Sequence, residues 1–143
     1  MFFLKVSFRR VRKEAVIPCY AHQGDAGMDL YSCEQRTLEQ GEPYLFKLGF
    51  SSMFDEGFVG LIQDRSSMGL RGVRTLGGVV DAGYRGEWGV ILINLTEKEV
   101  LINKGDKIAQ VLFLPVVQAQ VFGEESRTPS SSRGSGGFGS TGK

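Results

Sequence analysis

Residues 73–95 read VRTLGGVVDAGYRGEWGVILINL, and this stretch holds the pattern that decides the fold. It contains three short apolar runs, Val73–Leu76, Val79–Val80 and Gly89–Leu95. Glycine-rich turns separate the runs, and a turn signal such as Asp81-Ala82-Gly83 ends one strand and starts the next. Short strands with glycine turns between them are typical of β-sandwiches and barrels.

The same pattern continues on both sides of this stretch. Further short apolar or alternating runs are Leu4–Phe8, Tyr44–Phe50, Phe58–Ile62, Val100–Ile102, Ile108–Leu114 and Val117–Phe122. No long segment has a helical period. We therefore expect an all-β protein, and 143 residues are about the length of one domain.

Two of the runs, Val90–Leu95 and Ile108–Leu114, are apolar without alternation. A strand that is apolar on both faces is typically covered on both. One face would meet the domain core, and the other is predicted to meet another subunit.

Composition excludes several classes of function. The net charge is +1, which favours neither nucleic acid nor a membrane as a partner. Cys19 and Cys33 are too far apart for a CxxC zinc motif, and the chain has one histidine. The apolar start is too short for a signal peptide. We expect a reduced, cytoplasmic protein.

The end of the chain differs from the rest, because 12 of the 21 residues in 123–143 are Gly or Ser. Such a segment buries too little apolar surface to order itself. We predict a β domain at 1–122 and a flexible arm at 123–143. Within the arm, Arg133–Gly142 combines a guanidinium, an aromatic ring and hydroxyls among glycines, which suits a lid that grips phosphate and stacks on a base.

Four internal stretches carry further chemistry: Ala26–Leu30, Arg65–Gly69, Gly77–Gly86 and Gly105–Gln110. Arg65 followed by two serines suits phosphate. A serine nucleophile is disfavoured, since His22 is the only histidine and no Gly-x-Ser-x-Gly is present. Gly77–Gly86 is predicted to form a hairpin in which Asp81 accepts a proton from water, with a simple type I turn as the alternative. Gln110, inside an apolar strand, needs hydrogen-bond partners.

Together with Arg133–Gly142, these four stretches occur in the order found in the trimeric dUTP diphosphatases (dUTPases), which the chain resembles over nearly its whole length. The resemblance implies a jelly-roll or distorted β-barrel protomer with a flexible Gly/Ser-rich C-terminal arm. It also implies a homotrimer with three shared active sites. The implied reaction is hydrolysis of dUTP to dUMP and diphosphate with Mg²⁺, which keeps uracil out of DNA.

The resemblance also assigns roles to residues. Asp81 would activate the attacking water, and Asp29 would assist the metal through water. Tyr84 would pack under the deoxyribose. The implied uracil and sugar contacts further include Gly78, Val79, Val80 and Gly89. The implied phosphate ligands are Arg65, Ser66, Ser67 and Gln110. From the arm, Arg133 would reach the γ-phosphate, Phe138 would stack on uracil, and Gly139, Ser140 and Thr141 would cover the phosphates.

One departure from the family pattern is Asp64, which stands where many relatives have proline before the arginine. An acid beside a phosphate site is unfavourable unless it points away. Two alternatives share the fold: a dCTP deaminase or bifunctional relative, and a nucleotide-binding regulator. The deaminase needs a glutamate on the strand after Gly77–Gly86, where this chain has the apolar residues Val90-Ile91-Leu92.

Overall fold

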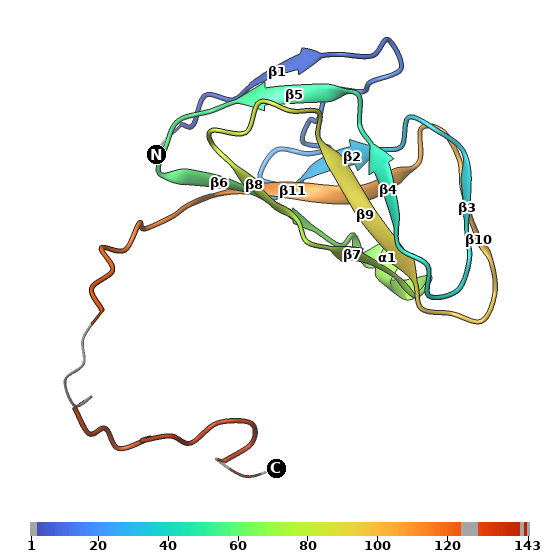
Figure 1. Cartoon of the computed structure of the whole chain (residues 1–143). Helices are drawn as coiled ribbons and strands as arrows, with labels where there is room; N and C mark the ends of the chain where they lie inside the picture. The colour runs from blue at the N-terminus through green and yellow to red at the C-terminus, as the bar shows by residue number, and fades with distance from the viewer. Residues whose placement is uncertain (1–2, 124–128, 141, 143) are drawn as a thin grey trace.

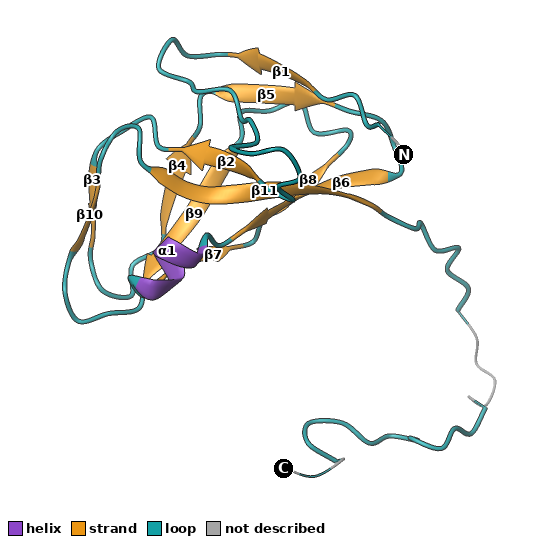
Figure 2. Cartoon of the chain, turned by 180° about the vertical axis from the view of Figure 1, so that it is seen from behind, coloured by secondary structure: helices purple, strands orange, loops and turns teal. Residues whose placement is uncertain are grey.

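The computed structural model describes residues 3–123, 129–140 and 142. Within these residues the chain forms eleven strands and one short helix, and strands dominate the molecule (Figure 2). The elements are β1 (Ser7–Arg10), β2 (Met28–Tyr31), β3 (Arg36–Leu38), β4 (Tyr44–Lys47), β5 (Phe50–Met53), β6 (Phe58–Gln63), α1 (Ser66–Leu70), β7 (Val73–Leu76), β8 (Val79–Asp81), β9 (Gly89–Asn94), β10 (Val100–Ile102) and β11 (Lys107–Pro115). This outcome confirms the all-β prediction.

The strands form two larger sheets and two ribbons. The larger sheets have the orders β2-β11-β6-β8 and β4-β9-β7, and the ribbons are β1-β5 and β10-β3. Every pairing between these named strands is antiparallel. The long strand β11 runs through the middle of the molecule between β2 and β6 (Figure 1). Strand β11 therefore connects β2 to β6 at the centre of the fold.

One apolar core fills the space that these sheets enclose. Its largest fully buried side chains are Trp88, Phe46 and Phe50. On β9, Val90 and Leu92 are buried, whereas Ile91 between them keeps 36% of its surface exposed. One face of β9 therefore lies in the core, and the other, which includes Ile91, stays at the surface of the single chain. Whether another subunit covers it stays a prediction.

Most predicted strands match, but the boundaries differ where tertiary contacts intervene. The run Tyr44–Phe50 is two strands, because Gly49 turns the backbone at φ +74° and a Cβ there would lie 2.9 Å from Ala15. The predicted strand Leu4–Phe8 begins to pair only at Ser7. Strands β2 and β3 and helix α1 were not predicted.

The predicted strand Val117–Phe122 is wrong. Regular structure ends at Pro115, which pairs with Phe58, the first residue of β6. One further hydrogen bond, 2.8 Å from the Val116 amide to the Gly57 carbonyl, ends the pairing. Because Phe58 is the first residue of β6, that strand has no further residue to pair with β11, and Val117 is 96% exposed.

The described part of the arm contains turns and no helix or strand, and it leads away from the β body (Figure 1). Its division from the β domain at residue 122 stays a prediction. Among the described residues, no helix is long and apolar enough to span a membrane.

Candidate active site

Two open clefts of similar size collect most of the predicted site residues. The first, here called the Arg65 cleft, has a volume of about 560 Å³. Its lining is Ala21, His22, Asp25, Ala26, Gly27, Asp29, Arg65, Ser66, Ser67, Lys107 and Gln110. The second, the Asp81 cleft, has a volume of about 510 Å³. Its lining is Leu45, Lys47, Ile62, Leu76, Gly78, Val79, Val80, Asp81, Tyr84, Glu87, Trp88, Gly89 and Ile91.

Helix α1 presents the hydroxyls of the Arg65 cleft. Arg65 is the residue before the helix, with extended backbone angles, and its carbonyl accepts hydrogen bonds from the Met68 and Gly69 amides at 3.0 Å. Ser66 and Ser67 form the exposed first turn. Their amides belong to the helix end whose N–H groups have no partner inside the helix. Both serines line the Arg65 cleft, where their hydroxyls can donate hydrogen bonds to an anion.

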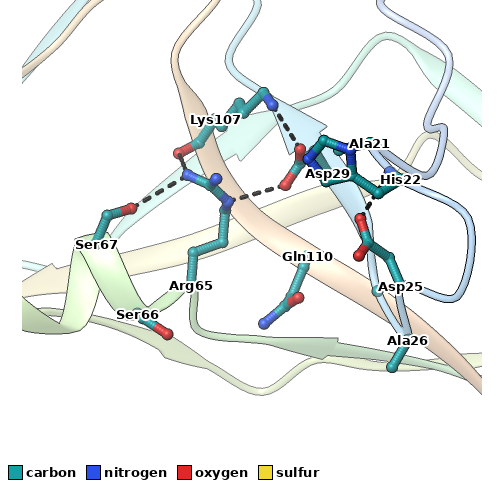
Figure 3. A pocket seen from close by; sticks show the side chains of 11 residues that line it. Ala21, His22, Asp25, Ala26, Asp29, Arg65, Ser66, Ser67, Lys107 and Gln110 are labelled. Atoms are coloured by element: carbon teal, nitrogen blue, oxygen red, sulfur yellow. Dashed lines mark hydrogen bonds and ion pairs between the residues drawn. The ribbon is translucent and has the colours of Figure 1, made fainter.

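Asp29 lies at the centre of a charged network in this cleft (Figure 3). Arg65 Nε lies 2.9 Å from Asp29 Oδ1, and Lys107 Nζ lies 2.7 Å from Oδ2. The Asp29 side chain is 11% exposed, so the two cations balance the charge of a carboxylate that is nearly removed from water. The hydrogen bond from Lys107 to Asp29, together with the carboxylate's negative charge, raises the pKa of the Lys107 ammonium.

Gln110 enters the same cleft from β11. Its Nε2 donates a 2.8 Å hydrogen bond to the Asp64 carbonyl, which satisfies the partner that the sequence requires. A Cβ on Gly27 would collide with the Gln110 side-chain oxygen, so any other residue at position 27 would displace the Gln110 amide. The close approach of the Gln110 side chain therefore explains why position 27 is a glycine.

Asp64 points away from the Arg65 cleft. Its Oδ1 accepts hydrogen bonds from the Thr75 amide at 2.6 Å and the Thr75 hydroxyl at 2.8 Å, and Oδ2 accepts one from Arg74 Nε at 3.0 Å. Burial alone would raise the pKa of Asp64, but the hydrogen bonds from Thr75 and Arg74 outweigh it and lower the pKa. The unfavourable case of an acid facing a phosphate site is therefore avoided.

The Asp81 cleft lies along β8, an edge strand that pairs with β6 on one side only. The Gly78 carbonyl accepts a 2.8 Å hydrogen bond from the Ile62 amide. Because successive residues of a strand point their amides and carbonyls to opposite sides, those of Val79 face outward. Gly78 has φ +107°, and a Cβ there would lie 2.7 Å from the Ile62 carbonyl.

The predicted hairpin at Gly77–Gly86 is wrong in its pairing. Strand β8 pairs with β6 rather than with β9, because Gly77 and Gly78, both at positive φ, move the chain from one sheet to the other. The alternative of a turn headed by Asp81 is observed, since the Tyr84 amide donates a 3.0 Å hydrogen bond to the Asp81 carbonyl.

The turn holds Tyr84 at the cleft. Its hydroxyl donates a 2.9 Å hydrogen bond to the Glu87 carbonyl, while 45% of the residue stays exposed. A Cβ on Gly86 would collide with the Tyr84 ring. Gly89 pairs with Lys47 on the neighbouring strand β4, and a Cβ on Gly89 would lie 2.6 Å from Leu45 Cδ1, so the Leu45 side chain would have to move.

The structure therefore separates the predicted residues into two groups. The Arg65 cleft brings together Asp29, Arg65, Ser66, Ser67 and Gln110. The Asp81 cleft brings together Gly78, Val79, Val80, Asp81, Tyr84 and Gly89. The arm residues Arg133, Phe138, Gly139 and Ser140 line neither cleft, and Thr141 lies outside the described residues.

Sequence reasoning missed Lys107. Lys107 lies in the stretch Gly105–Gln110, three residues before the predicted phosphate ligand Gln110. A lysine so close to a predicted phosphate ligand was the signal in the sequence that could have identified it. In the arm, Arg133 Nε donates a 3.0 Å hydrogen bond to the Gly136 carbonyl, and Phe138 is exposed with φ +49°.

A family model described as dUTPase matches residues 13–142. The chain is 44% identical to a deoxyuridine 5′-triphosphate nucleotidohydrolase of Clostridium tetani, over 96% of this chain and 97% of the relative. A Clostridium kluyveri protein with the same name is 39% identical, over 97% and 99%.

Comparison with solved structures also finds dUTPases. A mutant dUTPase of Staphylococcus bacteriophage 80alpha with dUpNHpp superposes with a TM-score of 0.85 at 26% identity, covering 97% of this chain and 99% of that one. A mutant dUTPase from phage phi11 of S. aureus, in which a structural Mg(II) ion is coordinated, gives 0.80 at 25% identity, covering 87% and 99%. This chain belongs to the dUTPase family. The jelly-roll prediction is thereby confirmed.

Proposed function

We propose that the Arg65 cleft and the Asp81 cleft are two parts of one composite active site, in which this dUTP diphosphatase hydrolyses dUTP to dUMP and diphosphate. The observation that carries the proposal is the division of chemistry between the clefts. The Arg65 cleft offers a guanidinium, two hydroxyls and an amide, which suit phosphates. The Asp81 cleft offers an exposed strand edge, a tyrosine ring and a carboxylate, which suit a nucleoside and a water molecule.

The composite site requires more than one copy of the chain. The reaction needs the carboxylate of Asp81 near the phosphates, yet Asp81 lines one cleft and Arg65 the other. A homotrimer in which one copy supplies the Arg65 cleft and a neighbour supplies the Asp81 cleft meets this need. The apolar face of β9 that includes Ile91 is available for such contacts.

Asp81 acts as the general base. Its side chain is exposed at the end of β8, so a water molecule can lie between the carboxylate and the triphosphate. The carboxylate takes a proton as the water oxygen bonds to phosphorus, and diphosphate leaves. Such chemistry depends on alignment and charge stabilisation more than on a strong nucleophile.

The edge of β8 selects uracil. The outward amide and carbonyl of Val79 present one donor and one acceptor, which a pyrimidine edge can pair with as an added strand would. Gly78, Val80 and Gly89 complete this part of the cleft. Tyr84, fixed by its bond to the Glu87 carbonyl, packs under the deoxyribose and leaves no room for a 2′-hydroxyl.

Mg²⁺ is the cofactor that the family implies. The residues present fit an Mg²⁺ ion that is held mainly by the substrate and contacts the protein through water. Among the described residues, no cluster of three or more His, Cys, Asp or Glu is arranged to hold a metal. Mg²⁺ usually keeps several waters and is bound largely through substrate phosphates. Asp29, with both oxygens already on cations, would contact it through water. The ion would neutralise charge that develops on the phosphates.

The arm closes the site. Arg133 binds the γ-phosphate, Phe138 stacks on uracil, and Gly139, Ser140 and Thr141 cover the phosphates. Support comes from the glycines at positive φ, including Gly134 and Gly139, which give the segment successive tight turns. Closing excludes water from the reacting phosphates.

The protein acts on a free nucleotide in the cytoplasm, with neither nucleic acid nor a membrane as partner. Both cysteines, Cys19 and Cys33, are free thiols, as is usual in a reducing compartment.

The test is diphosphate release from dUTP, dTTP, dCTP and UTP, each with and without Mg²⁺. We expect turnover of dUTP alone, and comparable turnover of UTP would contradict the assignment. Ammonia release from dCTP would instead indicate the deaminase, which β9 disfavours because Gly89–Asn94 carries no carboxylate. Light scattering should give three chains of 15.7 kDa per particle, and a stable monomer would contradict the composite site.

A further inference from the structure

Lys107 has a place in the Arg65 cleft that the proposed roles do not use. We propose that Lys107 is a positioning residue: its ammonium group holds one oxygen of Asp29, so that Nη2 of the Arg65 guanidinium stays available to bound phosphate. This inference rests on the proposed function, because it concerns phosphate binding in the same cleft.

The two cations divide the Asp29 carboxylate between them. Arg65 Nε takes Oδ1 at 2.9 Å and Lys107 Nζ takes Oδ2 at 2.7 Å (Figure 3). Arg65 Nη1 also donates to Ser67 Oγ at 3.2 Å and to the Lys107 carbonyl at 3.4 Å. Within the described residues, Nη2 makes no hydrogen bond, which leaves it for a ligand.

The geometry explains why a second cation is needed. An arginine beside a carboxylate favours a bidentate pair, in which two of its nitrogens bind both oxygens. If Oδ2 of Asp29 had no partner, the guanidinium would rotate so that Nη2 could bind Oδ2. Nη2 would then no longer be available to a ligand in the cleft. Lys107 occupies Oδ2 and thereby prevents this turn. It also supplies the partner that a buried carboxylate oxygen requires, since Asp29 is only 8% exposed.

A local irregularity in β11 places Lys107 on the correct side. Residues 107 and 110 are an odd number apart, so a regular strand would direct their side chains to opposite faces. The register of β11 against β2 shifts between Lys107 and Ala109, and both Lys107 and Gln110 line the Arg65 cleft. Such bulges re-aim side chains and occur next to active sites.

The first experiment compares Lys107→Met, Lys107→Arg and the control Lys104→Met. Lys104 is an exposed lysine three residues away, so the control removes the same charge without touching Asp29. We expect Lys107→Met to lower kcat/KM for dUTP about tenfold, the loss of roughly one charged contact. Lys107→Arg should restore it to within about threefold, and Lys104→Met should change it less than about twofold. Equal effects of Lys107→Met and Lys104→Met would overturn the proposal.

The second experiment separates positioning from direct phosphate contact. Lys107→Met is added to Asp29→Asn, and the affinity for a non-hydrolysable dUTP analogue is measured by calorimetry without added metal. If Lys107 acts through Asp29, its loss should change affinity less than about twofold in that background. A loss of about tenfold in both backgrounds would mean direct contact and overturn the proposal. Wild-type protein that binds the analogue but fails to turn over dUTP would instead contradict the proposed function alone.

Discussion

Asp64 and Thr75 are joined by two hydrogen bonds to one oxygen: the Thr75 amide lies 2.6 Å and its hydroxyl 2.8 Å from Asp64 Oδ1. This contact links the end of β6, next to Arg65, to β7, which leads through Gly77 to Gly78 of the Asp81 cleft. The Asp64 carbonyl meanwhile accepts the Gln110 side chain at 2.8 Å. Asp64 is therefore a structural tie between the two clefts.

Replacing Asp64 with alanine should destabilise the protein. The change leaves the Thr75 amide and hydroxyl without partners and removes the ion pair to Arg74, so we expect a loss of about 1–3 kcal/mol in the free energy of unfolding. Asp64→Asn keeps an acceptor for Thr75 and should lose about half as much. Urea titration at fixed protein concentration measures the free energy of unfolding of both variants. An alanine variant as stable as wild type would contradict the structural role of Asp64.

The pH dependence of stability should follow Asp64. The pKa of the Asp64 carboxyl is lower in the folded chain than in the unfolded chain. The ionised carboxylate therefore adds to the free energy of unfolding in full above its unfolded pKa of about 4, and this contribution is lost as the pH falls through the folded pKa. Wild type should thus exceed Asp64→Asn in unfolding free energy at pH 7 and lose that advantage toward pH 3. Paired urea titrations at the two pH values check this, and a constant difference would show that the charge of Asp64 is unimportant.

Replacing Asp81 with asparagine should abolish turnover and preserve binding. The amide has nearly the shape of the carboxylate but cannot accept a water proton, so kcat should fall by at least about 10³-fold, within the usual range for general acid–base catalysis. Affinity for a non-hydrolysable dUTP analogue should stay within about threefold. Asp55→Asn, at an exposed turn, is the control. Near-normal rates for Asp81→Asn would remove Asp81 as the base.

Removing the arm before Arg133 should leave folding intact. The hydrogen bonds of Arg133, Gly134 and Gly136 stay within residues 131–136, and none of the hydrogen bonds between described residues joins these three to the β body. The thermal midpoint should therefore change by less than about 2 °C, whereas kcat should fall at least about tenfold for lack of the lid. Full activity of the truncated chain would contradict the lid, even in a dUTPase.

Gly27→Ala should disturb Gln110. The added Cβ would occupy the space of the Gln110 side-chain oxygen and push the amide off the Asp64 carbonyl, so KM for dUTP should rise about tenfold. Gly123→Ala, where a Cβ meets open space, should leave KM unchanged. An unaltered KM for Gly27→Ala would mean that Gln110 holds no phosphate.

The sequence by itself determined the all-β class and most strand positions, and it supplied the residues that are proposed to carry the chemistry. These features are local: strand period, glycine turns and motif order need no knowledge of partners. Val100–Ile102 was predicted at its observed bounds because turns isolate it on both sides. The family resemblance followed from the same local stretches.

Only the tertiary structure decided which strand pairs with which and where each polar group points. Strand β8 joins β6 rather than β9, and Asp64 turns to Thr75 rather than to the cleft. The ion pairs of Asp29 unite residues from β2, β11 and the start of α1. Such pairings depend on long-range packing and backbone hydrogen bonding, which a local pattern of residues does not encode.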